Sequence, residues 1–265
     1  MSGASRILHL DLRIEPYTPQ SLIQANHTVL NTYMRYTEMT REGLPTSSQA
    51  RSEFDDVGSG DAKQSFYVHG EWLTTYSEFF AAAMRKEWKE GQERVVPLPE
   101  DEPEIFKILA SFLYTGIINS VKADDRDGDE GKDREYQRLM FAWFLGNKLL
   151  CIAFQNAVID ALIEKLMENP GHPPLDLHRE AYSITVGSCG MRRLVVDVAV
   201  FIWPKGQLAK AAEFADCTEF YRDVLARYVG MTDKQRRRNP SFYGEGDCCL
   251  YHDHGDRKCY KTVWR

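Results

Sequence analysis

The chain has 265 residues, 43% of them hydrophobic and 27% charged, which is an ordinary composition for a folded protein of one or two domains. Its formal net charge is −6, and the segment 124–135 alone carries seven acids and three bases, so the rest of the chain is close to neutral. This balance gives no support to a broad nucleic-acid-binding face.

Signals for export or membrane insertion are not expected. No uninterrupted apolar core follows a basic start near the N-terminus. The longest apolar run, Leu194 to Trp203, is broken by Asp197 and falls well short of the roughly 18 residues that span a bilayer. Six cysteines without a secretion signal are typical of reduced thiols. We therefore expect an intracellular protein, of the nucleus or the cytoplasm.

The first elements follow from short-range hydrophobic patterns. Residues 1–54 carry scattered apolar residues without clean periodicity, and we expect an N-terminal extension with at most one short helix. Alternating apolar residues predict a strand over 65–69, and helical spacing of apolar residues predicts a helix over 71–85. A short strand over 94–98, closed by prolines, follows.

Helices dominate the next part of the chain. Pro103 suits the first turn of a helix that is apolar over a wide arc and that ends at Gly116. The acidic segment 121–135 is predicted to be a flexible loop. Further apolar spacing predicts helices around 136–144 and 154–162.

A second region begins after the helix-breaking residues 169–174, where we place the main domain boundary. This region is predicted to be helical over 175–230. Its last helix is expected to start at Asp216, in a capping box with Glu219. The tail, 231–265, is basic and then rich in cysteine and histidine, and it is predicted to be irregular.

Several of these segments follow one another in a characteristic order. They are the His69, Leu73, Ser77 and Phe80 spacing, Trp88–Val96, Pro99–Phe106, Leu113–Gly116 and Leu145–Cys151. Together they resemble a BTB/POZ domain, in the divergent form found in many fungal proteins. The resemblance implies an α+β fold over residues 55–168, in which a small sheet is flanked by helices. The mostly helical region 175–230 then forms a C-terminal extension.

One part of the family pattern is absent from this chain. Family members normally begin with an apolar strand after an aspartate, and that strand forms a hairpin with the strand at Phe66. Here the stretch from Phe54 to Gly60 contains the aspartates but lacks the β-forming residues. Either the first strand is very short or the sequence was truncated, and a lost strand would expose the edge of its neighbour.

The resemblance implies a protein–protein interaction module that is not an enzyme. Its partners would be proteins, with no membrane and with nucleic acid disfavoured. Such a domain would form homodimers or heterodimers through its first strand and the helix over 72–85. The expected dimer-interface residues are Trp72, Leu73, Tyr76 and Phe79.

A second surface could bind another partner. In adaptors of this family, the position of Trp88 and Glu90 can hold a hydrophobic-x-acid motif that contacts a cullin scaffold. A tryptophan would supply an apolar anchor and a glutamate would set the register. The expected partner-binding residues are Trp88, Glu90, Glu100, Asp101 and Glu102.

Three hypotheses remain open for the function. The first is an interaction scaffold without further activity. The second is a substrate adaptor of a cullin-type E3 ubiquitin ligase. The competing interpretation of the motif is that Trp88 packs on its own domain and Glu90 is merely solvated. The third is a transcription-associated factor, although no finger array or helix-turn-helix signature is visible.

Residues that could carry chemistry have simpler interpretations. His69 lies between a strand and a helix and is expected to be structural, and Ser77 is expected to hydrogen-bond to backbone or to a neighbouring side chain. No nucleophile elbow, phosphate-binding loop, dinucleotide glycine motif or His-Glu-x-x-His is present. We therefore expect no catalytic residue and no cofactor.

The tail carries one further signal. It contains residues of types that bind Zn²⁺, but their spacing is not that of a standard finger; they are the adjacent Cys248 and Cys249, then His252, His254 and Cys259. A zinc knuckle and free thiols in a loose tail are the two interpretations, and we favour the second, with no metal. Lys234 to Arg238 could be a nuclear import signal or a solvated linker.

Overall fold

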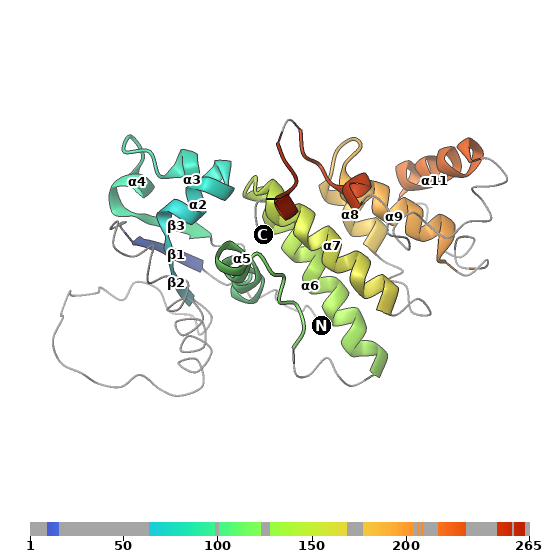
Figure 1. Cartoon of the computed structure of the whole chain (residues 1–265), viewed down its shortest axis with the longest axis horizontal. Helices are drawn as coiled ribbons and strands as arrows, with labels where there is room; N and C mark the ends of the chain where they lie inside the picture. Colours follow the sequence, from blue (N-terminus) through green and yellow to red (C-terminus); the bar gives the residue numbers. More distant parts are fainter. Residues whose placement is uncertain are drawn as a thin grey trace, which may run out of the picture. The chain divides into compact units, whose positions relative to one another are not determined.

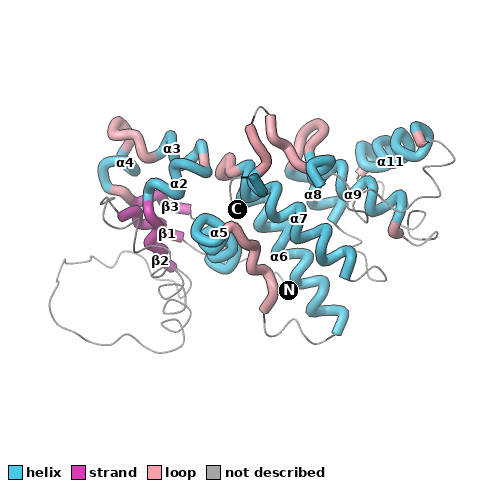
Figure 2. The backbone as a smooth tube through the Cα atoms, in the orientation of Figure 1, coloured by secondary structure: helices cyan, strands magenta, loops and turns pink. Residues whose placement is uncertain are grey.

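Figure 1 shows the fold in a computed structural model of the chain, and Figure 2 shows the same elements by type. The structure describes residues 10–15, 64–98, 101–122, 128–168, 177–203, 206, 208, 217–231, 248–255 and 257–262. The chain divides into two compact units. One comprises residues 1–74 and 83–103, and the other comprises 75–82 and 104–265.

The first unit contains a three-stranded sheet of mixed direction. Its strands are β1 (Leu10–Glu15), β2 (Gln64–His69) and β3 (Val95–Leu98), in the order β2-β1-β3 (Figure 1). The central strand β1 runs parallel to β2, with Leu10 opposite Gln64, and antiparallel to β3, with Leu10 opposite Leu98.

The central strand β1 was not expected, because residues 1–54 were predicted to hold at most one short helix. Its six residues alternate leucine or isoleucine with charged residues, which is a strand pattern that the prediction missed. The pattern is short, and its two partner strands lie far away in the sequence. The segment from Phe54 to Gly60, where the family's first strand would fall, lies outside the described residues.

The predicted strands β2 and β3 are present and supply the core of the first unit. Phe66 and Val68 of β2 are buried, whereas Tyr67 and His69 are exposed, as the alternating pattern requires. The short helix α4 (Lys89–Glu93) precedes β3 and was not predicted. The buried residues of this unit also include Leu73, Val96 and Leu98.

The helix predicted over 71–85 is two helices, α2 (Gly70–Tyr76) and α3 (Glu78–Ala83), which are separated at Ser77. The Ser77 hydroxyl accepts a hydrogen bond from the Phe80 amide (3.1 Å) and donates one to the Leu149 carbonyl (2.5 Å). Serine is a favoured residue at a helix N-cap because it satisfies an amide that has no partner within the helix. The predicted role of Ser77 in hydrogen bonding to backbone is therefore confirmed.

The second unit is helical. Its helices are α5 (Pro103–Thr115), α6 (Gly128–Lys148), α7 (Ile152–Glu168), α8 (Leu177–Ile184), α9 (Gly190–Phe201) and α11 (Thr218–Gly230), with 3-10 turns η3 (Cys248–Tyr251) and η4 (Tyr260–Thr262) (Figure 1). Gly116 ends α5 with a positive φ of 71°, the conformation expected of a glycine just after a helix. These elements confirm the α+β fold with a mostly helical C-terminal extension.

Aromatic and aliphatic side chains fill the core of the helical unit. Phe112 of α5 and Phe154 of α7 lie with ring centroids 5.4 Å apart. The largest fully buried side chains of this unit are Phe80, Phe106, Phe112, Tyr136, Trp143, Phe154, Phe220 and Tyr251. Among the described residues, none of the helices combines the length and the hydrophobicity that a membrane span requires.

Two local predictions for the helical unit were wrong. The acidic segment 121–135 is not a loop throughout, because α6 begins at Gly128 and Glu135 makes partly buried contacts with Ser120 and Lys165. The capping box at the start of α11 is not formed. Cys217 is the N-cap without a side-chain hydrogen bond, and Glu219 instead pairs with Arg192 at 2.8 Å.

Candidate functional site

Trp88 stands on the surface of the first unit at the start of α4. Its side chain is 59% exposed, and its backbone is extended, with φ −97° and ψ 150°. The Trp88 amide donates to the Arg85 carbonyl (3.0 Å), and the Trp88 carbonyl accepts from the Gln92 amide (3.1 Å). The Gln92 side chain also donates to the Lys86 carbonyl (3.0 Å). These bonds fix a compact turn that holds a large aromatic side chain toward solvent.

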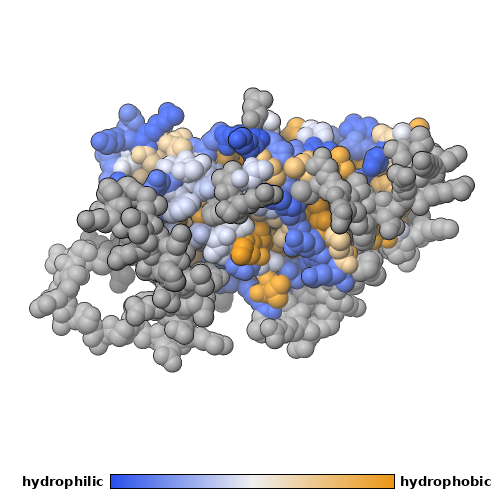
Figure 3. Space-filling view, in the orientation of Figure 1, coloured by the Kyte–Doolittle hydropathy of each residue, from blue (hydrophilic) through white to orange (hydrophobic). Residues whose placement is uncertain are grey.

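A glycine makes this turn possible. A Cβ atom on Gly91 would lie 2.1 Å from the Arg85 carbonyl oxygen, so no other residue fits without moving the backbone. Charged residues flank Trp88 in the sequence, the exposed Lys89 and Glu93 form a pair at 3.7 Å, and Figure 3 shows a mostly hydrophilic surface over α4. One exposed aromatic residue within a polar rim is typical of an anchor residue at a protein interface.

The other expected partner-binding residues vary in exposure. Glu90 is half-buried and Glu102 is exposed. Asp101 is half-buried, and its amide donates to the Leu98 carbonyl (3.3 Å), which ties the loop to the end of β3. Glu100 lies outside the described residues.

The expected dimer-interface residues also differ from one another. Trp72, Tyr76 and Phe79 each keep part of their surface exposed. Leu73, in contrast, is 0% exposed, so it is a core residue and has no surface that a partner could contact.

The C-terminal segment, which comprises residues 248–255 and 257–262, packs against the helices α7 and α9, contrary to the predicted loose tail. The buried Asn156 donates to the Asp253 carbonyl (3.2 Å) and accepts from the Asp253 amide (3.0 Å). The Asp253 carboxylate in turn accepts from the Gly190 amide (2.7 Å), at the start of α9, and from Arg193 (2.8 Å). Long-range hydrogen bonds of this kind cannot be read from the local pattern of an irregular segment.

A second polar network holds the same segment from the side of α9. The buried Tyr251 donates its hydroxyl hydrogen bond to Asp197 (2.8 Å). Asp197, itself buried, also accepts two hydrogen bonds from Arg227 of α11, at 2.6 and 3.2 Å. This carboxylate therefore joins α9, α11 and the C-terminal segment.

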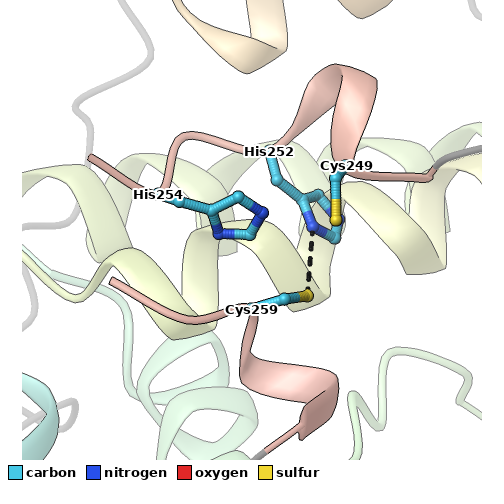
Figure 4. Close-up of side chains that lie close together, drawn as sticks. All are labelled: Cys249, His252, His254 and Cys259. Carbon is cyan, nitrogen blue, oxygen red and sulfur yellow. Dashed lines mark hydrogen bonds between the residues drawn. The ribbon is translucent and has the colours of Figure 1, made fainter. Parts of the chain in front are cut away.

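Four side chains of types that bind metals, two cysteines and two histidines, come together in the C-terminal segment, as Figure 4 shows. The candidate ligand atoms of Cys249, His252, His254 and Cys259 all lie within 4.8 Å of one another. Cys249 is in η3 and Cys259 precedes η4. The sequence pattern contains both Cys249 and the neighbouring Cys248, and the side chain of Cys248 lies outside those described. Neither Cys249 nor Cys259 forms a disulfide in this structure.

Asp160 of α7 supports this cluster and was not among the residues predicted from the sequence. Its carboxylate lies 3.0 Å from His252 Nε2 and accepts from the Tyr260 hydroxyl (2.5 Å) and the Lys261 ammonium (3.0 Å). Burial raises the pKa of Asp160, but the hydrogen bonds from His252 and Tyr260 outweigh it and hold the pKa below its ordinary value. The carboxylate is therefore charged where it meets the imidazole.

Other potentially reactive residues are engaged in packing. His178 is buried against Trp203 and Phe220, with ring centroids 5.3 and 4.4 Å away. Burial raises the pKa of the Cys151 thiol to about 12, which makes it a poor nucleophile. We therefore assign His178 and Cys151 to the packed core and not to a reactive site.

Two of the cavities among the described residues lie within the helical unit. The smaller, of about 210 Å³, is lined by His254 and Tyr260 but by no serine or cysteine. The larger, of about 530 Å³, is lined by Ser183 and Cys217 but by no histidine. Neither cavity brings a serine or cysteine nucleophile together with a histidine base.

Comparison with known families agrees with the fold. The family model of the BTB/POZ domain matches residues 48–127, a range that includes β2, the helices α2 to α4, β3 and α5. No solved structure gives a significant match to the chain. The match identifies a BTB/POZ domain in this chain, and BTB/POZ domains are protein–protein interaction modules. The central strand β1 lies outside the matched range.

Proposed function

We propose that this chain associates with a second BTB/POZ domain and presents Trp88 as the anchor for a further protein partner. The observation that carries this proposal is the exposure of Trp88 on a hydrogen-bonded turn. A side chain that is fixed before binding loses little conformational entropy when a partner covers it.

Self-association would use the partly exposed aromatic residues of α2 and α3. Trp72, Tyr76 and Phe79 retain surface that a second copy could cover, whereas Leu73 does not. A stable dimer needs on the order of 1,000 Å² of buried surface or more, which such residues and their neighbours would have to supply.

The dimer hypothesis predicts a concentration-dependent mass in light scattering. We expect the full chain to form a dimer and Phe79→Asp to raise the dimer dissociation constant at least about tenfold, because a charge would enter an apolar contact. Val186→Asp, at a position that is 97% exposed in the helical unit, is the matched control and should leave the dimer intact. A wild-type chain that stays monomeric at every concentration would contradict the hypothesis.

A substrate adaptor of a cullin-type E3 ubiquitin ligase is the more specific candidate. Trp88 would be the apolar anchor, Glu90 would set the register, and Asp101 and Glu102 would extend the acidic side of the surface. The exposure of Trp88 and Glu102 favours this assignment over a tryptophan that packs on its own domain.

The adaptor hypothesis predicts that the full chain binds the N-terminal region of a cullin. We expect Trp88→Ala combined with Glu90→Ala to weaken that binding about 10- to 30-fold in calorimetry, because anchor residues dominate interface energies. Tyr228→Ala removes an exposed aromatic residue from α11 and should have no effect. Equal affinities for the wild type and the double variant would exclude this surface.

A transcription-associated role is the remaining alternative. DNA binding with a steep salt dependence would favour it. The basic segment from Lys234 to Arg238, which could serve nuclear import, lies outside the described residues.

A further inference from the structure

We propose that Cys249, His252, His254 and Cys259 form a structural Zn²⁺ site that fastens the C-terminal segment to α7 and α9. Two thiolates and two imidazoles are a ligand set that selects Zn²⁺ in a tetrahedron. The four candidate ligand atoms lie within 4.8 Å of one another. In a tetrahedral zinc site such atoms are roughly 3.3–3.8 Å apart, so only a small contraction is needed.

One pair of ligand atoms already has a suitable separation. Cys259 Sγ lies 3.7 Å from His252 Nδ1, the contact drawn in Figure 4. A sulfur and a nitrogen bound to the same tetrahedral zinc ion lie about 3.5–3.6 Å apart. Nδ1 is therefore the ring nitrogen of His252 that would bind the metal.

The opposite nitrogen of His252 makes the contact that metal-bound histidines usually make. His252 Nε2 lies 3.0 Å from the Asp160 carboxylate, and the imidazole of His252 is buried. A zinc-bound histidine commonly donates its second ring N–H to a carboxylate, which fixes the tautomer and the ring orientation. Asp160 is thus a positioning residue for the site.

The backbone between the two histidines is held in place by α7. Asn156 exchanges two hydrogen bonds with the backbone of Asp253, the residue between His252 and His254, and its Nδ2 lies 3.5 Å from His254 Nδ1. Arg193 adds a hydrogen bond to the His252 carbonyl (3.2 Å). Both histidines are therefore positioned by contacts that do not involve a metal.

The ligand set points to a structural role for the metal. Four protein ligands complete the tetrahedral coordination of Zn²⁺ and leave no open position for water or substrate, so the site would stabilise the fold rather than catalyse a reaction. The free energy of metal binding would contribute to the stability of the folded C-terminal segment.

The test measures metal content in the full chain, purified through a tag that lacks histidine after expression with added zinc. We expect about one zinc ion per chain by elemental analysis and two sulfur plus two nitrogen ligands by X-ray absorption. Cys249→Ser and Cys259→Ser should each lose the zinc. Cys189→Ser, which removes a partly buried free thiol at the start of α9, is the matched control and should keep it.

Three outcomes would overturn the proposal. They are a wild-type chain that is purified without zinc, full zinc content in Cys259→Ser, and a Cys249–Cys259 disulfide found by peptide mass spectrometry. If the serine variants do not fold, Co²⁺ added to the metal-free wild-type chain replaces them as the probe. The visible absorption of tetrahedral Co²⁺ with thiolate ligands would support the site, and its absence would exclude it.

Discussion

Replacing Lys165 with alanine is expected to destabilise the chain by about 3–5 kcal/mol, because the Glu135 carboxylate then stays buried without its counter-charge. The Lys165 and Glu135 side chains are only 6% and 13% exposed, and they form an ion pair between α7 and α6. The Lys165 ammonium also lies 4.9 Å from the centroid of the Tyr136 ring. Urea denaturation followed by circular dichroism would measure the loss.

An exposed ion pair provides the matched control for this prediction. Lys89 and Glu93 are 3.7 Å apart and mostly exposed, so Lys89→Ala should change the unfolding free energy by less than about 1 kcal/mol. A second variant, Lys165→Met with Glu135→Leu, removes both buried charges and should recover much of the lost stability. Similar losses of unfolding free energy for Lys165→Ala and Lys89→Ala would show that breaking the buried pair costs no more than breaking an exposed one.

Replacing Gly190 with alanine is expected to cost about 3 kcal/mol and to release the C-terminal segment. A Cβ atom at this position would lie 1.9 Å from the Tyr251 carbonyl oxygen and 2.9 Å from Ile159 Cδ1. Because one of the two obstacles is backbone, the segment must move away from α9, which also breaks the hydrogen bond from the Gly190 amide to Asp253. Limited proteolysis should then cleave the segment more rapidly.

Gly230 is the natural control for this substitution. It ends α11, and a Cβ atom there would meet nothing within 4 Å. Gly230→Ala should therefore be neutral or slightly stabilising, since alanine favours the helix. Equal protease resistance in Gly190→Ala and the wild type would contradict the close approach of α9 and the C-terminal segment.

Local hydrophobic periodicity was sufficient to predict most elements of the fold. The strands β2 and β3 and the helix α5 were predicted because their signals, an alternating pattern and a helical apolar face, lie within one short segment. The break at Ser77 was missed because the apolar spacing continues across it. The strand β1 was missed because its partners are distant in the sequence.

The candidate site was only partly predictable. Trp88 was identified from its place in a family pattern, and its exposure is the new observation. For the C-terminal cluster, the sequence could not decide between two adjacent cysteines, since that choice depends on the path of η3. Asn156 and Asp160 did leave a signal, because they are four residues apart on the buried face of α7, where polar residues need partners.

The position of β1 has a consequence for the order in which the sheet can assemble. The ribosome synthesises β1 before its neighbours β2 and β3, which begin only at Gln64 and Val95. The pairing of β1 with β2 and β3 must therefore wait until most of the first unit has been synthesised. Closing such long loops slows folding relative to helices that form from local contacts. During translation β1 would remain an unpaired strand, a state in which nascent chains are prone to aggregation and depend on chaperones.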